Sequence, residues 1–545
     1  MNQMTVSVTF NEEKVAEQAA ETAARLVSEG VPEALAKGDP TLWGPEAQAE
    51  ATVRLGWLNL PRTSGELLPE IGKLVERARA QGLDHVVLAG MGGSSLAPEV
   101  ITATADVPLT VLDTTDPGQV RRALEDRLDR TILVVASKSG GTVETDSHRR
   151  IYEKAFRDAG IDPAERIVVV TDPGSPLEQT ALESGYPVIL ADPNVGGRYS
   201  ALSAFGLVPS ALAGADVEKL LDDAAAVQPL LAQTEGNPGL DLGAALGAAA
   251  VSGRDKLVLE DSLSEINGLP DWIEQLVAES TGKQGKGILP IVGAEPGEAP
   301  DELIVGIDSD GALAVGGPLG AQFLVWEYAT AIVGRILGID PFDQPNVAES
   351  KKNTAKLLAR PELPVGAPIL VDGPVEVYGE LPGSEVPKDL SDVFTRLLEA
   401  IPSRGYLAIM AYLDREAAFD APYAEGASFE EMTDAWSAAD PATLRAQLTL
   451  RTERPITFGW GPRFLHSTGQ YHKGGPQNGV FLQITGAVDE DVEVPGKPYT
   501  LGRLQLAQAL GDQGALARRG RPTVRLHLTD RAAGVARLLA VAREV

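Results

Sequence analysis

The segment Thr131-Ile-Leu-Val-Val-Ala-Ser-Lys-Ser-Gly-Gly-Thr-Val-Glu-Thr145 carries the strongest structural signal in this 545-residue chain. Its first part, residues 131–136, is apolar and typical of a strand that is buried on both faces of a parallel sheet. Its second part, residues 137–145, is a turn of hydroxyl residues, glycines and one lysine. A strand, a small hydroxylated loop and a helix together let backbone N–H groups and hydroxyls converge on a phosphate. The segment therefore predicts a phosphate-binding turn within an α/β fold.

A second loop of the same kind lies upstream. The run Val86-Val-Leu-Ala-Gly90 leads directly into Met91-Gly-Gly-Ser-Ser95. Two such loops in one chain point to a phosphorylated small molecule as the ligand. Each loop also has a structural alternative, because glycines permit a tight turn without any ligand and serines are well solvated at a surface.

Two nucleotide-binding interpretations of these loops match only in part. The upstream loop lacks the third glycine of a dinucleotide fingerprint, because Ser95 stands at that position. Asp113 follows the next predicted strand, roughly where a ribose-binding acid would fall, so a nicotinamide oxidoreductase stays an open alternative. Gly282-Lys283 lacks the preceding glycine of a Walker A loop, and Gln284 replaces the residue that would bind magnesium.

Bulk properties narrow the class of protein. The length exceeds what one hydrophobic core usually supports, and 43% hydrophobic with 23% charged residues is ordinary for a globular protein. The net charge of −30 argues against a nucleic-acid partner, whose phosphates need a basic surface. An anionic ligand must therefore be held by local dipoles and a few placed cations.

Further classes are excluded by what the composition lacks. The chain has no cysteine, which rules out disulfides, thiolate zinc sites and cysteine nucleophiles. Its first residues lack a signal pattern, and no segment approaches about 18 uninterrupted apolar residues. We expect a cytoplasmic protein with no membrane partner, and the five histidines suggest no metal cluster.

The spacing of apolar residues predicts an α/β fold of two doubly wound parallel-sheet lobes. A helical N-terminal segment, residues 1–80, precedes a first lobe at 81–230, where short β-branched runs alternate with helical stretches. A second lobe follows at 231–545, with an insertion at about 361–387. A closing helix is expected at 530–545 behind a Thr529 cap. The predicted strands are 85–89, 109–112, 132–136, 167–171 and 187–190, then 256–259, 288–292, 303–307, 368–371, 406–411, 479–485 and 523–527.

Six segments resemble those of the phosphoglucose isomerase family. They are Gly90–Ser94, Ser137–Thr145, Gly196-Gly-Arg-Tyr-Ser200, Glu279-Ser-Thr-Gly-Lys283, Phe342-Asp-Gln-Pro-Asn-Val-Ala-Glu-Ser-Lys351 and Leu465-His-Ser-Thr-Gly-Gln470. The sequences of these segments are most similar to the isomerase half of bifunctional transaldolase–phosphoglucose isomerase proteins. A transaldolase barrel needs roughly 250 residues, and Gly90 stands too near the start of the chain to leave room for one.

The resemblance implies lobes of the sugar-isomerase (SIS) type and the interconversion of glucose 6-phosphate and fructose 6-phosphate in glycolysis and gluconeogenesis. In this reaction a proton moves between C1 and C2 through a cis-enediol. By resemblance, Glu279 is the base and Arg198 stabilises the enediolate. His466 opens the sugar ring, Lys351 assists the opening, and Gln344 contacts the substrate.

The resemblance also implies the phosphate site, no cofactor and a homodimer, because the family's active site lies at a dimer interface. The expected phosphate-binding residues are Gly92, Gly93, Ser94, Ser137, Lys138 through its backbone N–H, Ser139 and Thr142. A non-catalytic phosphosugar sensor of the same fold is the alternative, since it would keep this loop without needing the catalytic residues.

Two departures from the family pattern stand out. Gly140-Gly141 replaces the usual Phe-Thr of the phosphate loop, which removes one hydroxyl and gives backbone amides a larger role. His466 follows Lys351 in this chain, whereas the family's histidine segment comes first. Either the segments are reordered around one site or one assignment is wrong, and His472 and Lys473 lie close enough to be rivals for the histidine role.

Overall fold

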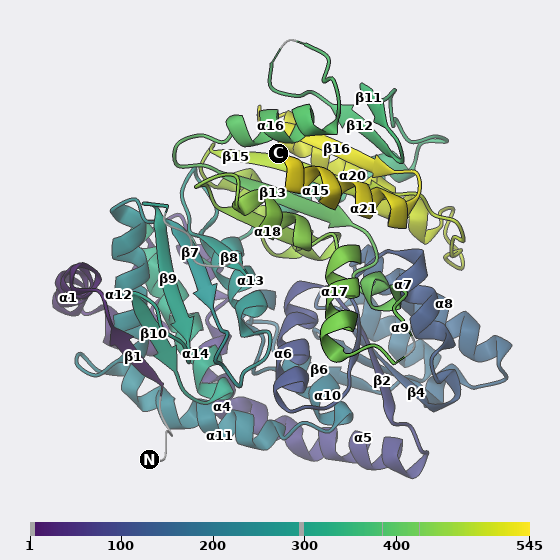
Figure 1. The fold of residues 1–545 in the computed structure, drawn as a ribbon. Helices are drawn as coiled ribbons and strands as arrows, with labels where there is room; N and C mark the ends of the chain where they lie inside the picture. The colour runs from purple at the N-terminus through teal and green to yellow at the C-terminus, as the bar shows by residue number, and fades with distance from the viewer. Residues whose placement is uncertain (1–5, 294–298, 384, 425) are drawn as a thin grey trace.

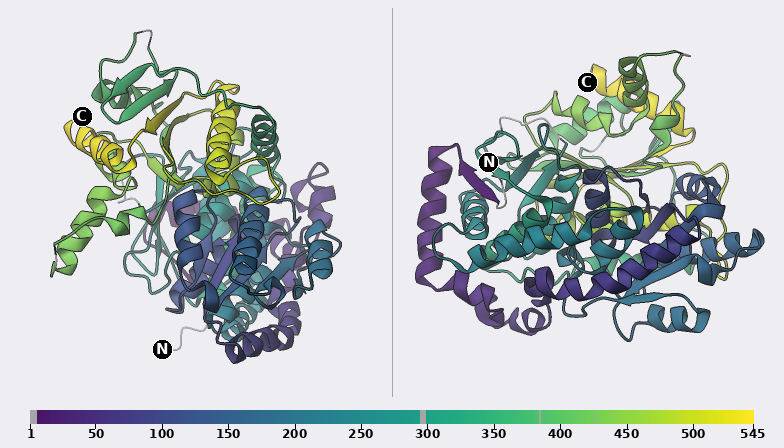
Figure 2. Two further views of the ribbon diagram at one scale, coloured as in Figure 1. Left: turned by 90° about the vertical axis from the view of Figure 1, so that its right-hand side faces the viewer. Right: turned by 90° about the horizontal axis from the view of Figure 1, so that it is seen from below.

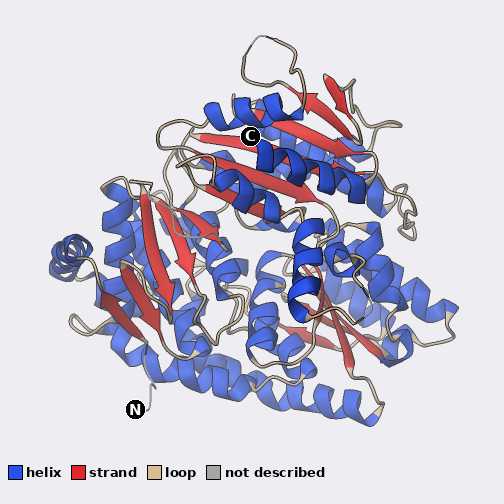
Figure 3. Ribbon diagram, viewed as in Figure 1, coloured by secondary structure: helices blue, strands red, loops and turns tan. Residues whose placement is uncertain are grey.

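A computed structural model describes residues 6–293, 299–383, 385–424 and 426–545. The described residues form three separate sheets, each flanked by helices (Figures 1 and 3). In a view turned by 90° about the vertical axis, the third sheet, coloured green to yellow, caps the purple-to-teal remainder of the chain (Figure 2, left). The α/β class expected from the sequence is confirmed.

The first sheet is wholly parallel, with the strand order β3-β2-β4-β5-β6. Its strands are β2 (His85–Gly90), β3 (Thr110–Leu112), β4 (Thr131–Ala136), β5 (Ile167–Thr171) and β6 (Val188–Leu190). The central strands are buried along their whole length, because alternate residues face helices on opposite sides. The helices are α5 (Leu68–Ala80), α6 (Leu96–Thr104), α7 (Pro117–Glu125), α8 (Val143–Asp158), α9 (Pro176–Ser184) and α10 (Ala204–Ala213).

The second sheet has the order β1-β10-β9-β7-β8, in which only β1 is antiparallel to its neighbour. Its strands are β1 (Ser7–Phe10), β7 (Lys256–Glu260), β8 (Leu289–Val292), β9 (Glu302–Ile307) and β10 (Leu313–Gly316). Strand β1 brings the N-terminal segment into this sheet. The associated helices are α11 (Val217–Val227), α12 (Pro238–Val251), α13 (Leu269–Thr281) and α14 (Leu319–Leu337).

The third sheet has the order β11-β12-β16-β15-β13-β14, parallel except at β11 and β12. Its strands are β11 (Leu370–Asp372), β12 (Val375–Gly379), β13 (Tyr406–Tyr412), β14 (Ile456–Trp460), β15 (Gly479–Gly486) and β16 (Thr523–Leu528). The helices that follow the second sheet are α15 (Val347–Leu358), α16 (Leu390–Glu399), α17 (Phe429–Ala439), α18 (Thr443–Thr449), α19 (Gly469–Gly474), α20 (Leu501–Ala517) and α21 (Arg531–Glu544). The N-terminal helices are α1 (Glu13–Ser28), α2 (Val31–Ala36), α3 (Gln48–Thr52) and α4 (Leu60–Thr63).

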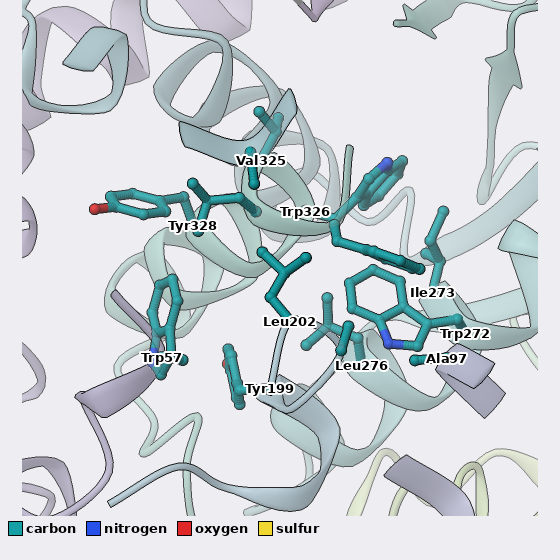
Figure 4. Close-up of a cluster of buried hydrophobic side chains, with 14 of the residues drawn as sticks. Trp57, Ala97, Tyr199, Leu202, Trp272, Ile273, Leu276, Val325, Trp326 and Tyr328 are labelled. Carbon is teal, nitrogen blue, oxygen red and sulfur yellow. The ribbon is translucent and has the colours of Figure 1, made fainter. Parts of the chain in front are cut away.

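The largest core joins the N-terminal helices to the first two sheets. Trp57 and Tyr199 stack with ring centroids 5.1 Å apart, and Tyr328 meets Trp57 edge-on. Trp272 of α13 and Phe323 of α14 pack edge-to-face at 4.7 Å. Trp272 lies in the same buried cluster as Trp57, Tyr199 and Tyr328 (Figure 4). Aromatic pairs of this kind add to the stabilisation from buried area. They fix the position of α13, the helix that carries Gln275 and Glu279.

All three sheets repeat one arrangement of their parallel strands. In each, the first strand lies between the second and the third, and the fourth follows, which is the flavodoxin-like order. The predicted domain boundaries stay a prediction, but residues 231–545 contain the third sheet and all strands of the second except β1, and the segment 361–387 contributes β11 and β12. One local expectation is wrong. The cap of α21 is Asp530, whose side chain accepts a hydrogen bond from the Ala533 N–H, because Asp530 rather than Thr529 immediately precedes the helix.

Candidate active site

The two glycine and serine loops meet at the edge of the first sheet. Strands β2 and β4 pair side by side, so the loops that leave their carboxyl ends are neighbours. Strand β3 lies on the other side of β2, which makes the space between β2 and β4 the point where the chain changes direction across the sheet. Ligands of doubly wound sheets bind at this point. The predicted phosphate-binding loops are therefore placed where such a fold holds its ligand.

The glycines of the upstream loop allow it to approach two other segments. A Cβ added at Gly93 would lie 1.9 Å from the Gly197 carbonyl oxygen. Gly92 has φ +56°, and a Cβ there would lie 2.7 Å from the Gln275 amide nitrogen. The loop, whose residues Gly92–Ser94 form a 3-10 turn, is thus packed against the Arg198 segment and helix α13. A larger residue at either glycine would force these segments apart.

The Ser137–Thr142 loop is shaped by hydroxyls and by Gly140. The Ser137 hydroxyl donates to the Thr142 hydroxyl at 3.2 Å, and the exposed Ser139 hydroxyl accepts from the Gly141 N–H at 3.3 Å. Thr142 stands before helix α8 without a side-chain cap bond, so the first N–H groups of this long helix face the loop. The Lys138 ammonium instead turns to Asp172 and to the Pro193 carbonyl. The backbone N–H of Lys138 stays the group that the sequence predicts for a phosphate.

Glu279, Arg198 and Gln344 come together in one buried cluster. Arg198 lies 3.2 Å from the Glu279 carboxylate and donates to the Gln344 side chain at 2.9 Å. It also donates to the Ser280 hydroxyl and to the Pro341 and Asp343 carbonyl groups. Arg198 is 3% exposed and Glu279 8% exposed. The guanidinium is therefore fixed in position beside the carboxylate that the resemblance names as the base.

Helix α13 joins this cluster to the histidine segment. The Gln275 side chain, one turn before Glu279, donates to the Glu279 carboxylate at 3.2 Å and to the His466 carbonyl at 2.8 Å. Glu279 Oε1 faces Arg198 while Oε2 faces Gln275. Both carboxylate oxygens are thus held by donors on two sides.

His466 faces a buried carboxylate on helix α8. Its Nε2 lies 3.3 Å from Glu144 Oε1, and the Gln508 side chain donates to the same oxygen at 2.6 Å. Burial alone would raise the pKa of the Glu144 carboxyl. The hydrogen bond and charge of His466, with a further contribution from Lys351, outweigh burial and lower that pKa to about 2. Glu144 therefore stays a carboxylate at neutral pH and orients the imidazole.

Lys351 and His466 line a single cavity of about 190 Å³. Gly141, Val143 and Glu144 of the phosphate-loop side line it too, as do residues of α15 and Gln508 of α20. The order of the histidine and lysine segments along the chain is unusual, yet the fold brings both to one wall. Glu279 and Arg198 do not line this cavity, and Gln275 connects their cluster to the His466 segment.

The rival histidine lies elsewhere. His472 on α19 is 2% exposed and packed among the rings of Tyr406, Phe464 and Phe481. Its two ring nitrogens have no hydrogen-bond partner among the described residues. Burial lowers its pKa well below the ordinary value, with Lys473 adding to the effect. The Lys473 ammonium is buried against Asp512 at 2.7 Å. Neither side chain lines the cavity.

Asp113 is also buried and already has partners within the protein. It is 1% exposed, accepts from the Ser95 hydroxyl at 3.2 Å, and pairs with Arg463 at 3.3 Å. A ribose-binding acid needs an accessible carboxylate, so this placement weighs against the dinucleotide interpretation.

Two residues of the site were not singled out from the sequence. Glu144 stands within the quoted phosphate loop but carries no distinguishing signal, because an acid in the first turn of a helix is ordinary. Gln275 precedes Glu279 by four residues, and this spacing places both on one face of a helix. That spacing is the signal that could have found Gln275. Glu144 could be found only once the fold had brought His466 to it.

The described residues hold no group of three or more metal-ligating side chains that could bind an ion. Over the same part of the chain, no helix is both long and apolar enough to cross a membrane.

Part of the chain is similar in sequence to known proteins. Residues 72–287 match the family model "Phosphoglucose isomerase". A probable glucose-6-phosphate isomerase from Haloarcula marismortui is 37% identical over 212 residues, which are 38% of this chain and 49% of that protein. A glucose-6-phosphate isomerase from Rubrobacter xylanophilus is 29% identical over 388 aligned residues, covering 56% of this chain and 89% of that protein. The chain thus spans about half the length of the first relative and most of the second.

Solved structures support the fold. A hypothetical protein from Thermus thermophilus aligns with a TM-score of 0.55 at 25% identity, over 65% of this chain and 100% of that chain. A glucose-6-phosphate isomerase from Chlamydia trachomatis aligns with a TM-score of 0.52 at 19% identity, over 66% of this chain and 90% of that chain. These alignments cover about two thirds of the present chain.

Proposed function

We propose that this chain is an aldose–ketose isomerase that interconverts glucose 6-phosphate and fructose 6-phosphate. The observation that carries the proposal is the placement of Glu279 between Arg198 and Gln275, next to the glycine loop at the edge of the first sheet. The family match over residues 72–287 contains both loops and Glu279. The names of the relatives supply the substrate pair.

The proton transfer is assigned to Glu279. A carboxylate can take the proton from C2 of the aldose and return it to C1 of the ketose, provided that it lies over both carbons. Negative charge develops on the enediolate oxygen during this step, and the permanently protonated Arg198 guanidinium stabilises it from a fixed position. Because Arg198 already makes four hydrogen bonds to protein groups, it costs little reorganisation when that charge forms.

Ring opening is assigned to His466. An imidazole can pass a proton from the O1 hydroxyl to the ring oxygen, and Glu144 holds Nε2 in a defined orientation for this exchange. Lys351 lines the same cavity and supplies positive charge near the oxygen atoms that change protonation.

The phosphate is assigned to the two loops. Gly92, Gly93 and Ser94 offer one set of groups, and Ser137, Ser139 and Thr142 with the Lys138 backbone offer the other. Holding the phosphate away from C1 and C2 fixes the reacting carbons relative to Glu279, which converts binding energy into orientation. The resemblance further suggests a homodimer, a cytoplasmic location and kinship with transaldolase–isomerase fusions, and these parts of the proposal rest on the resemblance alone.

The sensor alternative accounts for less of the structure. A protein that merely binds a phosphosugar needs the two loops, but it gives no reason for a buried carboxylate held by an arginine and a glutamine. The oxidoreductase alternative is weakened further by the buried Asp113–Arg463 pair.

The decisive experiment follows fructose 6-phosphate in D₂O by NMR, with purified chain and without added metal or nucleotide. Wild-type protein should form glucose 6-phosphate that carries deuterium at C2, because an enediol mechanism exchanges the transferred proton with solvent. Glu279→Gln should lower kcat by about 10³-fold, within the range of general-base removal.

Glu274→Gln on the same helix is the matched control. Burial, with Asp271 adding to it, raises the pKa of Glu274 to about 8, so glutamine reproduces its neutral form at pH 7 and turnover should persist. Saturable binding of fructose 6-phosphate to the wild type without turnover would overturn the enzyme proposal and favour the sensor. Equal losses in both variants would remove Glu279 from the role of base.

A further inference from the structure

Helix α20 beside the third sheet carries a row of buried polar side chains that contact the first lobe and the helices α15 and α19. Gln505, Gln508 and Asp512 are 4%, 2% and 0% exposed, and their spacing places them on one face of the helix. A helix face that lies inside a protein is ordinarily apolar, because burying an unpaired polar group is costly. Each of these side chains instead reaches a polar partner outside the third sheet's own strands.

Gln508 is held in one orientation by two contacts. Its Oε1 accepts from the Thr115 hydroxyl at 2.8 Å, and its Nε2 donates to Glu144 Oε1 at 2.6 Å. Thr115 lies in the loop between β3 and α7, and Glu144 lies in the first turn of α8. The carboxylate requires a donor, so the amide nitrogen must face Glu144 and its oxygen must face Thr115. A glutamine satisfies both neighbours at once.

The Glu144 carboxylate depends on this contact for its direction. Its Oε1 receives both His466 and Gln508, while its Oε2 is buried without a partner among the described residues. A carboxylate with one free oxygen can rotate about its last bond toward any other donor. Gln508 opposes that rotation, and it does so from a separate helix and not from a neighbouring residue in the sequence.

The same helix supports the lysine side of the cavity. Asp512 accepts from the Ser350 hydroxyl at 3.3 Å and from the Lys473 ammonium at 2.7 Å. Ser350 directly precedes Lys351 on α15. Helices α15 and α20 also approach closely, since a Cβ added at Gly511 would lie 3.0 Å from the Thr354 hydroxyl. Helix α20 therefore contacts the supports of both His466 and Lys351.

We infer that Gln508 is a positioning residue that fixes the Glu144 carboxylate toward His466, and that α20 acts as the support through which the third sheet sets the geometry of the cavity. The contact geometry stands independently of the reaction, while its catalytic meaning rests on the proposed isomerase function.

The pH dependence follows from the charges around Glu144. Besides His466, the groups that face it are Lys351 on α15, His148 on its own helix and Tyr412 at the end of β13. A hydrogen bond to the ionised form lowers the pKa of a carboxyl, so removing Gln508 should raise the pKa of Glu144 above its present value of about 2. Protonated Glu144 no longer offers the imidazole an ionised acceptor, and activity should then begin to fall at a higher pH on the acid side.

The test compares Gln508→Leu with Gln505→Leu in the full chain. Both remove a buried amide from one helix, but Gln505 donates to Asp116 at 3.3 Å and has no contact with Glu144. Gln508→Leu should lower kcat for fructose 6-phosphate by about 10- to 100-fold, as loss of an orienting partner does elsewhere. It should also move the acid limb of the kcat profile toward neutral pH, and Gln508→Asn should restore part of the activity. Gln505→Leu should leave the acid limb in place.

A readout without substrate separates this inference from the proposed function. Nitrogen-15 NMR of the imidazoles can resolve the five histidines, with His466 assigned from the signal that His466→Asn removes. Gln508→Leu should change the tautomer ratio of His466, and Gln505→Leu should not. Equal loss of thermal stability in both variants, with unchanged His466 signals and an unchanged acid limb, would overturn the inference. Wild-type protein that never isomerises the sugar would defeat the proposed function, while the imidazole signals would still decide the role of Gln508.

Discussion

The first and third sheets share one strand order but differ in the loops that leave their carboxyl ends. At the first sheet, β2 and β4 lead into loops of glycines and hydroxyl residues. At the third sheet, β13 leads to Asp414, which takes two hydrogen bonds from Arg122. Strand β15 leads to Ala487, whose carbonyl accepts from Arg531 of α21, and Arg531 also donates to Asp116 in the loop before α7 at 2.7 Å. The edge of the first sheet offers groups for a ligand. The corresponding edge of the third sheet contacts other parts of the chain instead.

This difference shows that strand order fixes where a ligand could bind and that loop chemistry decides whether one does. At the first sheet, the loops at the switch point carry the glycines and hydroxyl groups that we propose bind the ligand there. At the third sheet the same position is filled by ion pairs between lobes. What the third sheet gives to the site is support and two segments of chain, the His466 turn and helix α20.

The largest effect should follow from replacing the one catalytic side chain that we assign to the third sheet. His466→Asn removes the imidazole that faces Glu144, and turnover of the cyclic sugar should fall by about 10²- to 10⁴-fold. His472→Phe should instead keep most of the turnover, because His472 lies among aromatic rings. Steady-state kinetics on both variants, with unfolding followed by circular dichroism, separates the two histidines.

The opposite behaviour of the two histidine variants would contradict the conclusion that the third sheet contributes His466 to the site. Loss of turnover in a folded His472→Phe protein, with His466→Asn still active, would mean that the third sheet supplies its chemistry through α19 and not through the turn before it.

Much of the fold could be predicted from the sequence because parallel strands carry a strong local signal. The runs at residues 85–89, 132–136 and 167–171 are apolar on both faces, and they form β2, β4 and β5. Strands β1, β10, β12 and β14 were not expected. The short β1 and β10 carry mixed burial patterns, and β12 pairs with its neighbours antiparallel, so none of these three reads as a continuous buried run.

The site could be predicted only as far as its motifs reached. Arg198, Glu279 and Gln344, which the resemblance names, come from three separate segments, and the fold brings them together. Glu144 and Gln508 could not be paired from sequence, because 364 residues separate them and neither type is unusual where it stands. Long-range contacts between ordinary polar residues leave no periodic pattern, so this layer of the site becomes visible only in three dimensions.

An intermediate effect should follow from changing the loop that distinguishes the first sheet. Gly140 has φ +66°, and a Cβ there would lie 2.7 Å from the Leu177 Cβ and 2.8 Å from the Leu177 nitrogen. Gly140→Ala must therefore shift the loop, at a cost of roughly 1–2 kcal/mol for the backbone conformation alone. KM for fructose 6-phosphate should rise by about tenfold, since 1.4 kcal/mol is a factor of ten in binding.

Gly141→Ala is the matched control for this loop. A Cβ at Gly141 would meet only the Ser139 hydroxyl, at 3.6 Å, and its φ is not positive. Its increase in KM should be the smaller one. If Gly140→Ala left KM unchanged, the conformation of this loop would not be what makes the first sheet a ligand site.

The smallest effect on turnover, and a distinct one on stability, should come from the docking contacts of the third sheet. Glu99 on α6 accepts from Arg463 and lies 3.0 Å from Arg415, which follows β13. Burial would raise the pKa of Glu99, but the two arginines outweigh it and lower the pKa from 4.5 to about 2. The ion pairs thus add stability that is fully present above pH 4.5 and is lost as the pH falls toward 2.

Glu99→Gln should therefore lower the free energy of unfolding at pH 7 by about 1–3 kcal/mol, between the ranges for exposed and buried pairs. The difference from wild type should shrink as the pH falls from 4.5, because the wild-type carboxyl is then protonated as well. Urea unfolding at a series of pH values measures both quantities, with the exposed Glu70→Gln as a control that should match wild type. A difference that persisted undiminished toward pH 2 would show that Glu99 stabilises the junction by packing and not by charge. The third sheet would then be held against α6 by packing, and the ion pairs of Glu99 would not distinguish its edge from that of the first sheet.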